Sequence, residues 1–283
     1  MIYVVTMVFF LLWSIWAIRK GCLSWHTIIN LYMVTLLIVD VGDVSFDHWF
    51  NFYDIPTYLL NNPYDLYMGI IFSDGMIFPL IAIVFCYYSV RYRRPWVLSI
   101  VFALLLGIIE VGYVKLGYMV YYQWNHWLTP GIIFILCQVL ACFSDRFVYY
   151  SPPIPYRLCL LSFVYGALEW PGAIMGGVMR LYNYRPHLFD NELADDRFTA
   201  VLFAVVMGGL IAYFAPRIRT RYKLAFFLSL GLLSTGFAFL MFERGWLIYH
   251  QWNHLLMSIR YIMPYILIYL YDSWESNYRQ NGN

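Results

Sequence analysis

The chain has 283 residues, of which 62% are hydrophobic and only 12% charged, and its mean hydropathy is +0.63. Soluble globular domains carry about 25% charged residues, so this composition excludes a soluble protein and predicts an all-α integral membrane protein. The net charge of +2 is small, and the distribution of charge along the chain is more informative than its size.

Apolar runs predict about nine transmembrane helices, because a helix needs roughly 20 mostly apolar residues to cross a bilayer. The first run lacks a basic leading segment and a small-residue cleavage site and continues directly into Arg19 and Lys20. We therefore expect a retained anchor helix and not a signal peptide. The nine runs lie near residues 2–18, 25–44, 66–89, 96–117, 127–143, 158–178, 198–216, 224–242 and 255–271.

Basic residues predict the orientation of the chain. If the connections are numbered alternately, 12 of the 18 Lys and Arg residues fall on one side, which the positive-inside rule makes cytoplasmic. The N-terminus is then outside and the C-terminus inside, and most acidic residues lie outside. Topology and attraction to anionic lipid explain the basic segment 217–223, so nucleic acid is not expected as a partner. All five cysteines fall at or near the inner side, where a reducing cytoplasm predicts free thiols.

An internal repeat divides the chain. The phrase QWNH occurs twice, within residues 115–127 and 243–255, and these two segments align without gaps. Each predicted repeat has four helices, an even number, so both copies enter the membrane from the same side and are related by a pseudo-twofold axis along the membrane normal. We expect an anchor helix in residues 1–24 and parallel four-helix repeats in residues 25–157 and 158–283. Two further matches occur in the same order, 73–84 with 195–206 and 51–56 with 181–186.

The first repeat resembles a family of small multi-pass membrane proteins of Gram-positive, often spore-forming bacteria. The residues that carry the resemblance are Tyr53, Pro56, Asp74, Pro79, Glu110 and the segment YQWNHW. The resemblance implies a bacterial plasma-membrane location and four-helix units, here fused in duplicate, but no activity. The second copy departs from the pattern, since Val201 and Ala238 stand where the first copy has Pro79 and Glu110.

Charged residues within predicted spans are the candidates for function, because a charge in the bilayer is costly. We expect an outward-facing polar cavity whose carboxylates and imidazoles bind a ligand or exchange protons. Two histidines are also candidate metal ligands, although they supply only half of the usual four. The candidates are Asp74, Glu110, Glu169, His126, His254, Asn125 and Asn253.

Structural roles are the alternative for several of these residues. Lys115 and Glu243 occupy equivalent positions in the two copies and are candidates for a structural ion pair. Trp124 and Trp252 suit the membrane interface, and Asn125 and Asn253 suit helix N-caps. Asp40, Asp43 and Asp47 are interpreted as solvated at the membrane boundary.

Three functions remain open from the sequence. The first is transport or binding of a small solute or cation, and the second is an intramembrane enzyme acting on a lipid or isoprenoid substrate. The third is a non-catalytic sensor or scaffold subunit, which the resemblance links to sporulation or germination. The sequence has no Walker A, GxSxG, HExxH or CxxC motif and points to no cofactor. The expected partners are the lipid bilayer and a small solute or cation.

Overall fold

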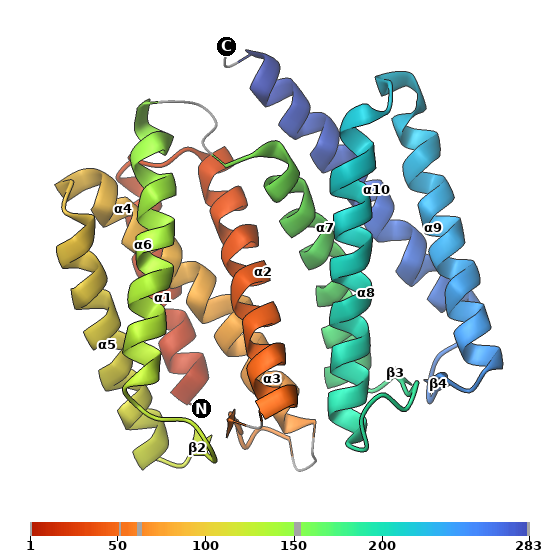
Figure 1. The fold of residues 1–283 in the computed structure, drawn as a ribbon, viewed down its shortest axis with the longest axis horizontal. Coiled ribbons are helices and arrows are strands. Elements are labelled where there is room, and N and C mark those ends of the chain that lie inside the picture. The colour runs from red at the N-terminus through yellow and green to blue at the C-terminus, as the bar shows by residue number, and fades with distance from the viewer. Residues whose placement is uncertain (1, 51, 61–63, 150–153, 282–283) are drawn as a thin grey trace. The chain divides into compact units, whose positions relative to one another are not determined.

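The protein consists of two compact helical units, Met1–Ile154 and Pro155–Asn283. The structure, a computed structural model, describes residues 2–50, 52–60, 64–149 and 154–281 (Figure 1). The first unit contains α1 (Ile2–Arg19), α2 (Trp25–Phe50), β1 (Tyr53–Asp54), α3 (Asp65–Phe72), η1 (Ser73–Ile77), α4 (Phe78–Tyr92), α5 (Pro95–Lys115), β2 (Val120–Tyr121) and α6 (Leu128–Tyr149). The second contains α7 (Tyr156–Gly172), η2 (Ala173–Val178), β3 (Tyr182–Tyr184), α8 (Glu192–Phe214), η3 (Ala215–Arg217), α9 (Thr220–Glu243), β4 (Leu247–Tyr249) and α10 (His254–Asn281).

Eight helical segments among the described residues are long and apolar enough to cross a membrane, which identifies a helical membrane protein. The ninth predicted span coincides with α6, whose apolar part Leu128–Cys142 is shorter. Large apolar side chains such as Ile108 and Leu233 are 72% and 68% exposed. An exposed apolar surface of this kind suits contact with lipid.

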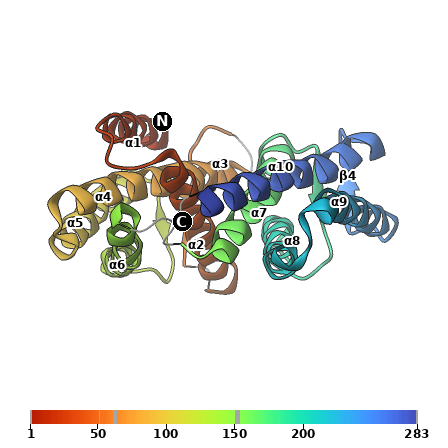
Figure 2. The same ribbon diagram turned by 90° about the horizontal axis from the view of Figure 1, so that it is seen from above.

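The first unit is built around α4. Figure 2 shows α4 between α1 on one side and α6 on the other. The helix is apolar on all sides and is almost completely buried from Pro79 to Tyr87, as expected for a helix surrounded by others. The hydroxyl of Ser14 on α1 donates to the carbonyl of Leu80 at 3.0 Å, so the predicted anchor helix is an integral part of this unit.

Small residues allow close approach at two places in the first unit. A Cβ at Gly107 of α5 would lie 2.8 Å from the ring of Pro130, which brings α5 and α6 together. A Cβ at Gly69 of α3 would lie 2.0 Å from the carbonyl oxygen of Ile55. The segment after β1 is therefore pressed directly against α3.

The second unit pairs α7 with α8 and α9 with α10. Gly208 of α8 packs on Leu161 of α7, where a Cβ would lie 2.8 Å from the leucine side chain. Lys223 of α9 forms a buried ion pair with Asp272 of α10 at 2.6 Å. The hydroxyl of Tyr156 donates to the same carboxylate, so one buried anion joins three helices.

Each unit carries one short antiparallel ribbon with the same local pattern. In the first, Tyr53 of β1 faces Tyr121 of β2, and in the second Tyr182 of β3 faces Tyr249 of β4. The backbone N–H groups of the next two residues after each second tyrosine donate to a single carbonyl, that of Phe52 in the first unit and Leu181 in the second.

The helix before each second strand also ends in the same way. Gly117 and Gly245 adopt positive φ angles of 77° and 71°, the left-handed conformation that glycine tolerates best. In both, the N–H of the next residue closes the helix end at 2.8 Å, from Tyr118 to the carbonyl of Tyr113 and from Trp246 to that of Met241. This is the hydrogen-bond pattern of a Schellman cap.

A carboxylate anchors the loop after each first strand. Asp65 accepts backbone N–H groups of residues 58–60, and Asp195 accepts those of residues 187–189. The sequence match of 73–84 with 195–206 instead aligned Asp74 with Asp196. That alignment is wrong, because hydrogen bonding makes Asp65 the counterpart of Asp195.

Candidate functional site

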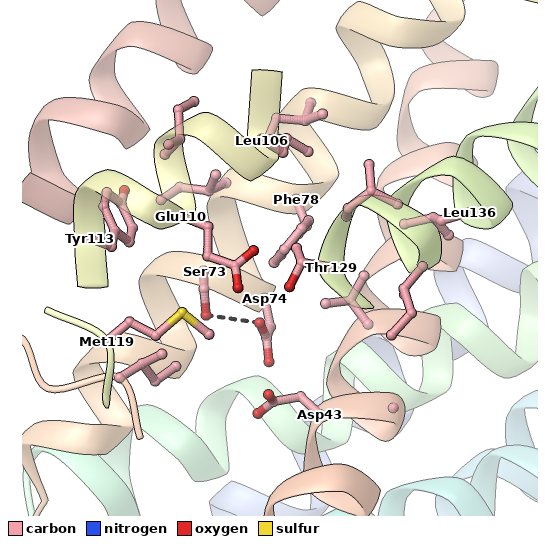
Figure 3. A pocket seen from close by; sticks show the side chains of 18 of the residues that line it. Asp43, Ser73, Asp74, Phe78, Leu106, Glu110, Tyr113, Met119, Thr129 and Leu136 are labelled. Carbon is pink, nitrogen blue, oxygen red and sulfur yellow. Dashed lines mark hydrogen bonds between the residues drawn. The ribbon is translucent and has the colours of Figure 1, made fainter. Parts of the chain in front are cut away.

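The first unit encloses a cavity of about 450 Å³ (Figure 3). Its walls come from α1, α2, η1, α4, α5 and α6, and most of the lining side chains are apolar. Ligand pockets typically measure about 300–1,000 Å³ and combine apolar walls with a few polar groups. The apolar wall includes Ile38, Ile81, Leu106, Ile109, Ile133 and Leu136.

Three carboxyl groups from three different elements line this cavity. Asp43 comes from α2, Asp74 from the π-helical turn η1, and Glu110 from α5, and their side chains converge in Figure 3. All three residues are buried, at 6%, 3% and 6% exposure. The structure places Asp74 and Glu110 in one cavity, and their role in binding or proton exchange stays a prediction. Boundary solvation of Asp40 and Asp43 is wrong because both are buried, and the side chain of Asp47 lies outside the described residues.

A π-helical turn positions Asp74. Such turns are rare and are frequent at functional sites, because the extra residue per turn redirects side chains. The hydroxyl of Ser73 donates to Asp74 Oδ1 at 2.8 Å. The hydroxyl of Tyr32 on α2 donates to the carbonyl of Gly75 within the same turn, which ties α2 to η1.

The ribbon supplies a tyrosine to two of the carboxylates. Tyr53 donates to Asp43 Oδ1, and Tyr121 donates to Glu110 Oε1. Burial, together with the hydrogen bond to Glu110, raises the pKa of Tyr121 above its usual range, so its hydroxyl remains protonated and available as a donor. Hydrogen bonds to a charged acceptor are the stronger class.

One carboxyl oxygen of the cavity-lining residue Glu110 can accept a further hydrogen bond. Its second oxygen, Oε2, is buried and has no hydrogen-bond partner within standard geometry among the described residues. The hydroxyl of Thr129 on α6 lies beside the carboxyl group in Figure 3. Thr129 in turn accepts the indole N–H of Trp124 at 2.8 Å.

Trp124 belongs to the repeated phrase and forms part of the cavity lining. Its ring packs against Tyr53, with 5.2 Å between ring centroids. The residue is therefore an element of the cavity wall, and its place at the membrane interface stays a prediction. Its counterpart Trp252 packs against Tyr182 at 5.6 Å in the second unit.

The asparagines of the phrase stabilise helix starts. Asn253 Oδ1 accepts the N–H of Leu256 at 2.9 Å, the geometry of an N-cap on α10. Asn125 Oδ1 accepts the N–H of Trp127 at 3.1 Å just before α6. Both asparagines are exposed, and neither Asn125 nor its neighbour His126 lines the cavity.

The two histidines are exposed, each within its own unit. His126 contacts the ring of Trp127, and His254 lies against Phe239, Phe242 and Tyr249. Across the described part of the chain, no three His, Cys, Asp or Glu side chains gather in a way that would hold a metal ion. A metal site at the histidines stays a prediction.

Lys115 and Glu243 are exposed at the C-terminal ends of α5 and α9. They belong to different units, and their ion pair likewise stays a prediction. A lysine in this position interacts favourably with the negative end of the helix dipole.

Glu169 lies in the second unit and is buried at 5% exposure. Buried Asp196, Arg197 and Arg260 accompany it, so this unit contains buried charges of both signs. Arg260 donates through Nε to the hydroxyl of Tyr182 at 3.1 Å and through Nη2 to the carbonyl of Leu168 at 2.5 Å. Sequence reasoning missed Arg260, although a lone arginine within an apolar run was a signal.

No family model, no curated protein and no solved structure matches this chain. The resemblance of the first repeat to Gram-positive membrane proteins therefore stays a prediction. The cavity geometry is the main observation on function.

Proposed function

We propose that the first unit is a membrane-embedded binding site for a small amphiphile. The main support is a cavity of about 450 Å³ whose apolar walls come from several helices. The carboxyl groups of Asp43, Asp74 and Glu110 line the same cavity. The walls suit a hydrocarbon body, and carboxylates accept hydrogen bonds from a polar head. Binding of this kind is the first step of the small-solute or cation transport considered from the sequence.

We further infer that the two units arose by duplication. Matching strand pairs, glycine-capped helix ends and aspartate-anchored loops support this inference. On this proposal the two units are parallel repeats in a bacterial plasma membrane, with the N-terminus outside and the C-terminus in the cytoplasm.

A photoreactive probe tests the binding proposal. The full-length protein in zwitterionic lipid nanodiscs is irradiated with a ten-carbon alcohol that carries a diazirine, and labelled peptides are mapped by mass spectrometry. We expect labelling concentrated on cavity residues of α2, α4, α5 and α6. Labelling spread evenly over lipid-facing residues such as Leu232 and Leu233 would contradict the proposal.

Two glycines provide a matched pair of variants. Gly42 lines the cavity, and a Cβ added there meets no atom within 4 Å, so Gly42→Leu adds a side chain to the cavity lining from an unobstructed position. Gly236 on α9 is equally unobstructed but exposed and outside the cavity. Gly42→Leu should reduce cavity labelling several-fold, and Gly236→Leu should leave it unchanged. Release of chemically altered probe would instead support the intramembrane enzyme.

A further inference from the structure

We propose that the ligand of the first-unit cavity carries a cationic head, an alkylguanidinium or alkylammonium group. This inference rests on the binding function proposed above and specifies its ligand. It comes from comparing corresponding positions of the two units. At those positions the second unit has lost the carboxyl groups and gained a buried guanidinium.

The shared hydrogen bonds define which residues correspond. Glu110 stands three residues before Tyr113, whose carbonyl closes the glycine cap, and Ala238 stands three residues before Met241 in the same role. The cap thus pairs Glu110 with Ala238. The sequence alignment gave the same pair.

The other two carboxyl groups also correspond to small residues. Asp43 precedes the ribbon tyrosine Tyr53 by ten residues, and Gly172 precedes Tyr182 by ten. Asp74 follows the loop anchor Asp65 by nine residues, and the residue nine after Asp195 is Ala204. All three cavity acids of the first unit are therefore replaced by glycine or alanine in the second.

The second unit has a buried cation, Arg260, close to these positions. His126 and His254 correspond through the repeated phrase, so Arg260, six residues after His254, corresponds to Ile132. Ile132 lines the cavity of the first unit. The guanidinium of Arg260 bonds to Tyr182, the counterpart of Tyr53.

Gly172 provides the space for this guanidinium. A Cβ at Gly172 would lie 2.8 Å from Nη2 of Arg260, so the residue that replaces Asp43 accommodates the cation. The second unit thus contains a tethered guanidinium where the first unit has carboxyl groups. The simplest physical reading is that a guanidinium or ammonium from a ligand suits the same place in the first unit.

The charge of the cavity agrees with this reading. No Lys, Arg or His is among the described residues that line it, whereas three carboxyl groups are. Glu110 lies in the cavity wall, and its buried Oε2 makes no hydrogen bond of standard geometry among the described residues, although Thr129 and Trp124 lie close to the carboxyl group. Carboxylates grouped in a buried cavity that no cationic side chain lines are costly, and a bound cation that donates hydrogen bonds offsets that cost. Apolar walls restrict the remainder of the ligand to a hydrocarbon body.

Competition against the diazirine alcohol tests the head group. The competitors are n-octylguanidinium, n-octylammonium, n-octanol and octanoate, which share a chain and differ in charge. In the wild-type protein we expect both cations to displace the probe at concentrations at least about tenfold lower than octanol, with octanoate weakest. Octanol competing as well as the cations would overturn the cationic head while leaving binding itself intact. Absence of cavity labelling by the neutral probe would instead overturn the binding proposal.

Two variants connect the preference to named residues. Glu110→Gln keeps the size of the side chain and removes its charge, so it should retain probe labelling but lose most of the preference for cations. Ile132→Arg places a tethered guanidinium at the position of Arg260 and should abolish competition by octylguanidinium, whereas Ile132→Met should not. An unchanged cation preference in folded Glu110→Gln would count against the proposal.

Discussion

Tyr53 and Tyr121 face each other across the β1–β2 ribbon and donate hydrogen bonds to carboxylates on two different helices. One reaches Asp43 on α2 and the other reaches Glu110 on α5. A two-stranded ribbon is marginally stable by itself, so these side-chain bonds attach it to the helices. The same bonds fix two of the three carboxyl groups of the cavity.

Removing either tyrosine hydroxyl should destabilise the first unit. Tyr53→Phe and Tyr121→Phe each remove one hydrogen-bond donor from a buried carboxylate, which costs about 1–3 kcal/mol. Unfolding in one detergent, followed by near-UV circular dichroism, measures the loss. Tyr122→Phe is the control, because its hydroxyl bonds to Asp54 at an exposed position, and we expect a change within about 0.5 kcal/mol. Equal stability of all three variants would refute the attachment.

The anchoring aspartates should matter equally in the two units. Asp65→Ala and Asp195→Ala each remove the acceptor of several backbone N–H groups and should cost about 3 kcal/mol. Limited proteolysis should then cut within residues 55–60 or 187–190 respectively. Exposed Asp190→Ala serves as the control and should resist cleavage as the wild type does. Cleavage that is no faster in Asp65→Ala than in the control would show that other contacts hold the loop.

The buried ion pair of the second unit predicts a non-additive pair of substitutions. Lys223→Met leaves Asp272 buried without its cation and should cost about 3–5 kcal/mol. Lys223→Met with Asp272→Leu removes both charges and should cost less than the sum of the single changes. A double-mutant cycle of unfolding free energies measures the coupling. Additive costs would mean that the pair contributes no coupling energy.

Cysteine labelling tests the predicted orientation. Cys22 is exposed just after α1, on the side predicted to be cytoplasmic. In a Cys142→Ala background, a membrane-impermeant maleimide should label Cys22 only after cells are permeabilised. His126→Cys in a background without Cys22 places a thiol at an exposed outer position and should react in intact cells. The reverse pattern would invert the orientation.

The sequence predicted the long apolar helices and singled out two of the residues that line the cavity. Apolar runs located the long helices because length and hydropathy determine membrane spans. Glu110 and Asp74 were identified because carboxyl groups are rare within such runs. Asp43 was misinterpreted as solvated, because its contact with Tyr53 accompanies a strand pairing that the local sequence does not encode.

Register was harder to predict than element type. Matching SDGM to DDRF by similarity paired the wrong aspartates. Asp65 and Asp195 each accept backbone N–H groups from the loop after the first strand of their own unit, but the sequences that flank them differ. The sequence of Ser73–Ile77 contains no pattern that indicates a π-helical turn. Arg260 was overlooked because its role depends on the space left at Gly172, a contact between distant segments.

The contact between Gly69 and Ile55 gives a handle for engineering the cavity from outside it. Any side chain at residue 69 would collide with the backbone that follows Tyr53, because a Cβ there lies 2.0 Å from the carbonyl oxygen of Ile55. Gly69→Ala would thus displace the segment after β1 from α3, and with it the tyrosines that hold Asp43 and Glu110, without replacing any cavity carboxylate. The fit of one glycine against one carbonyl therefore determines where a whole wall of the cavity lies, although neither residue is a carboxylate of the site.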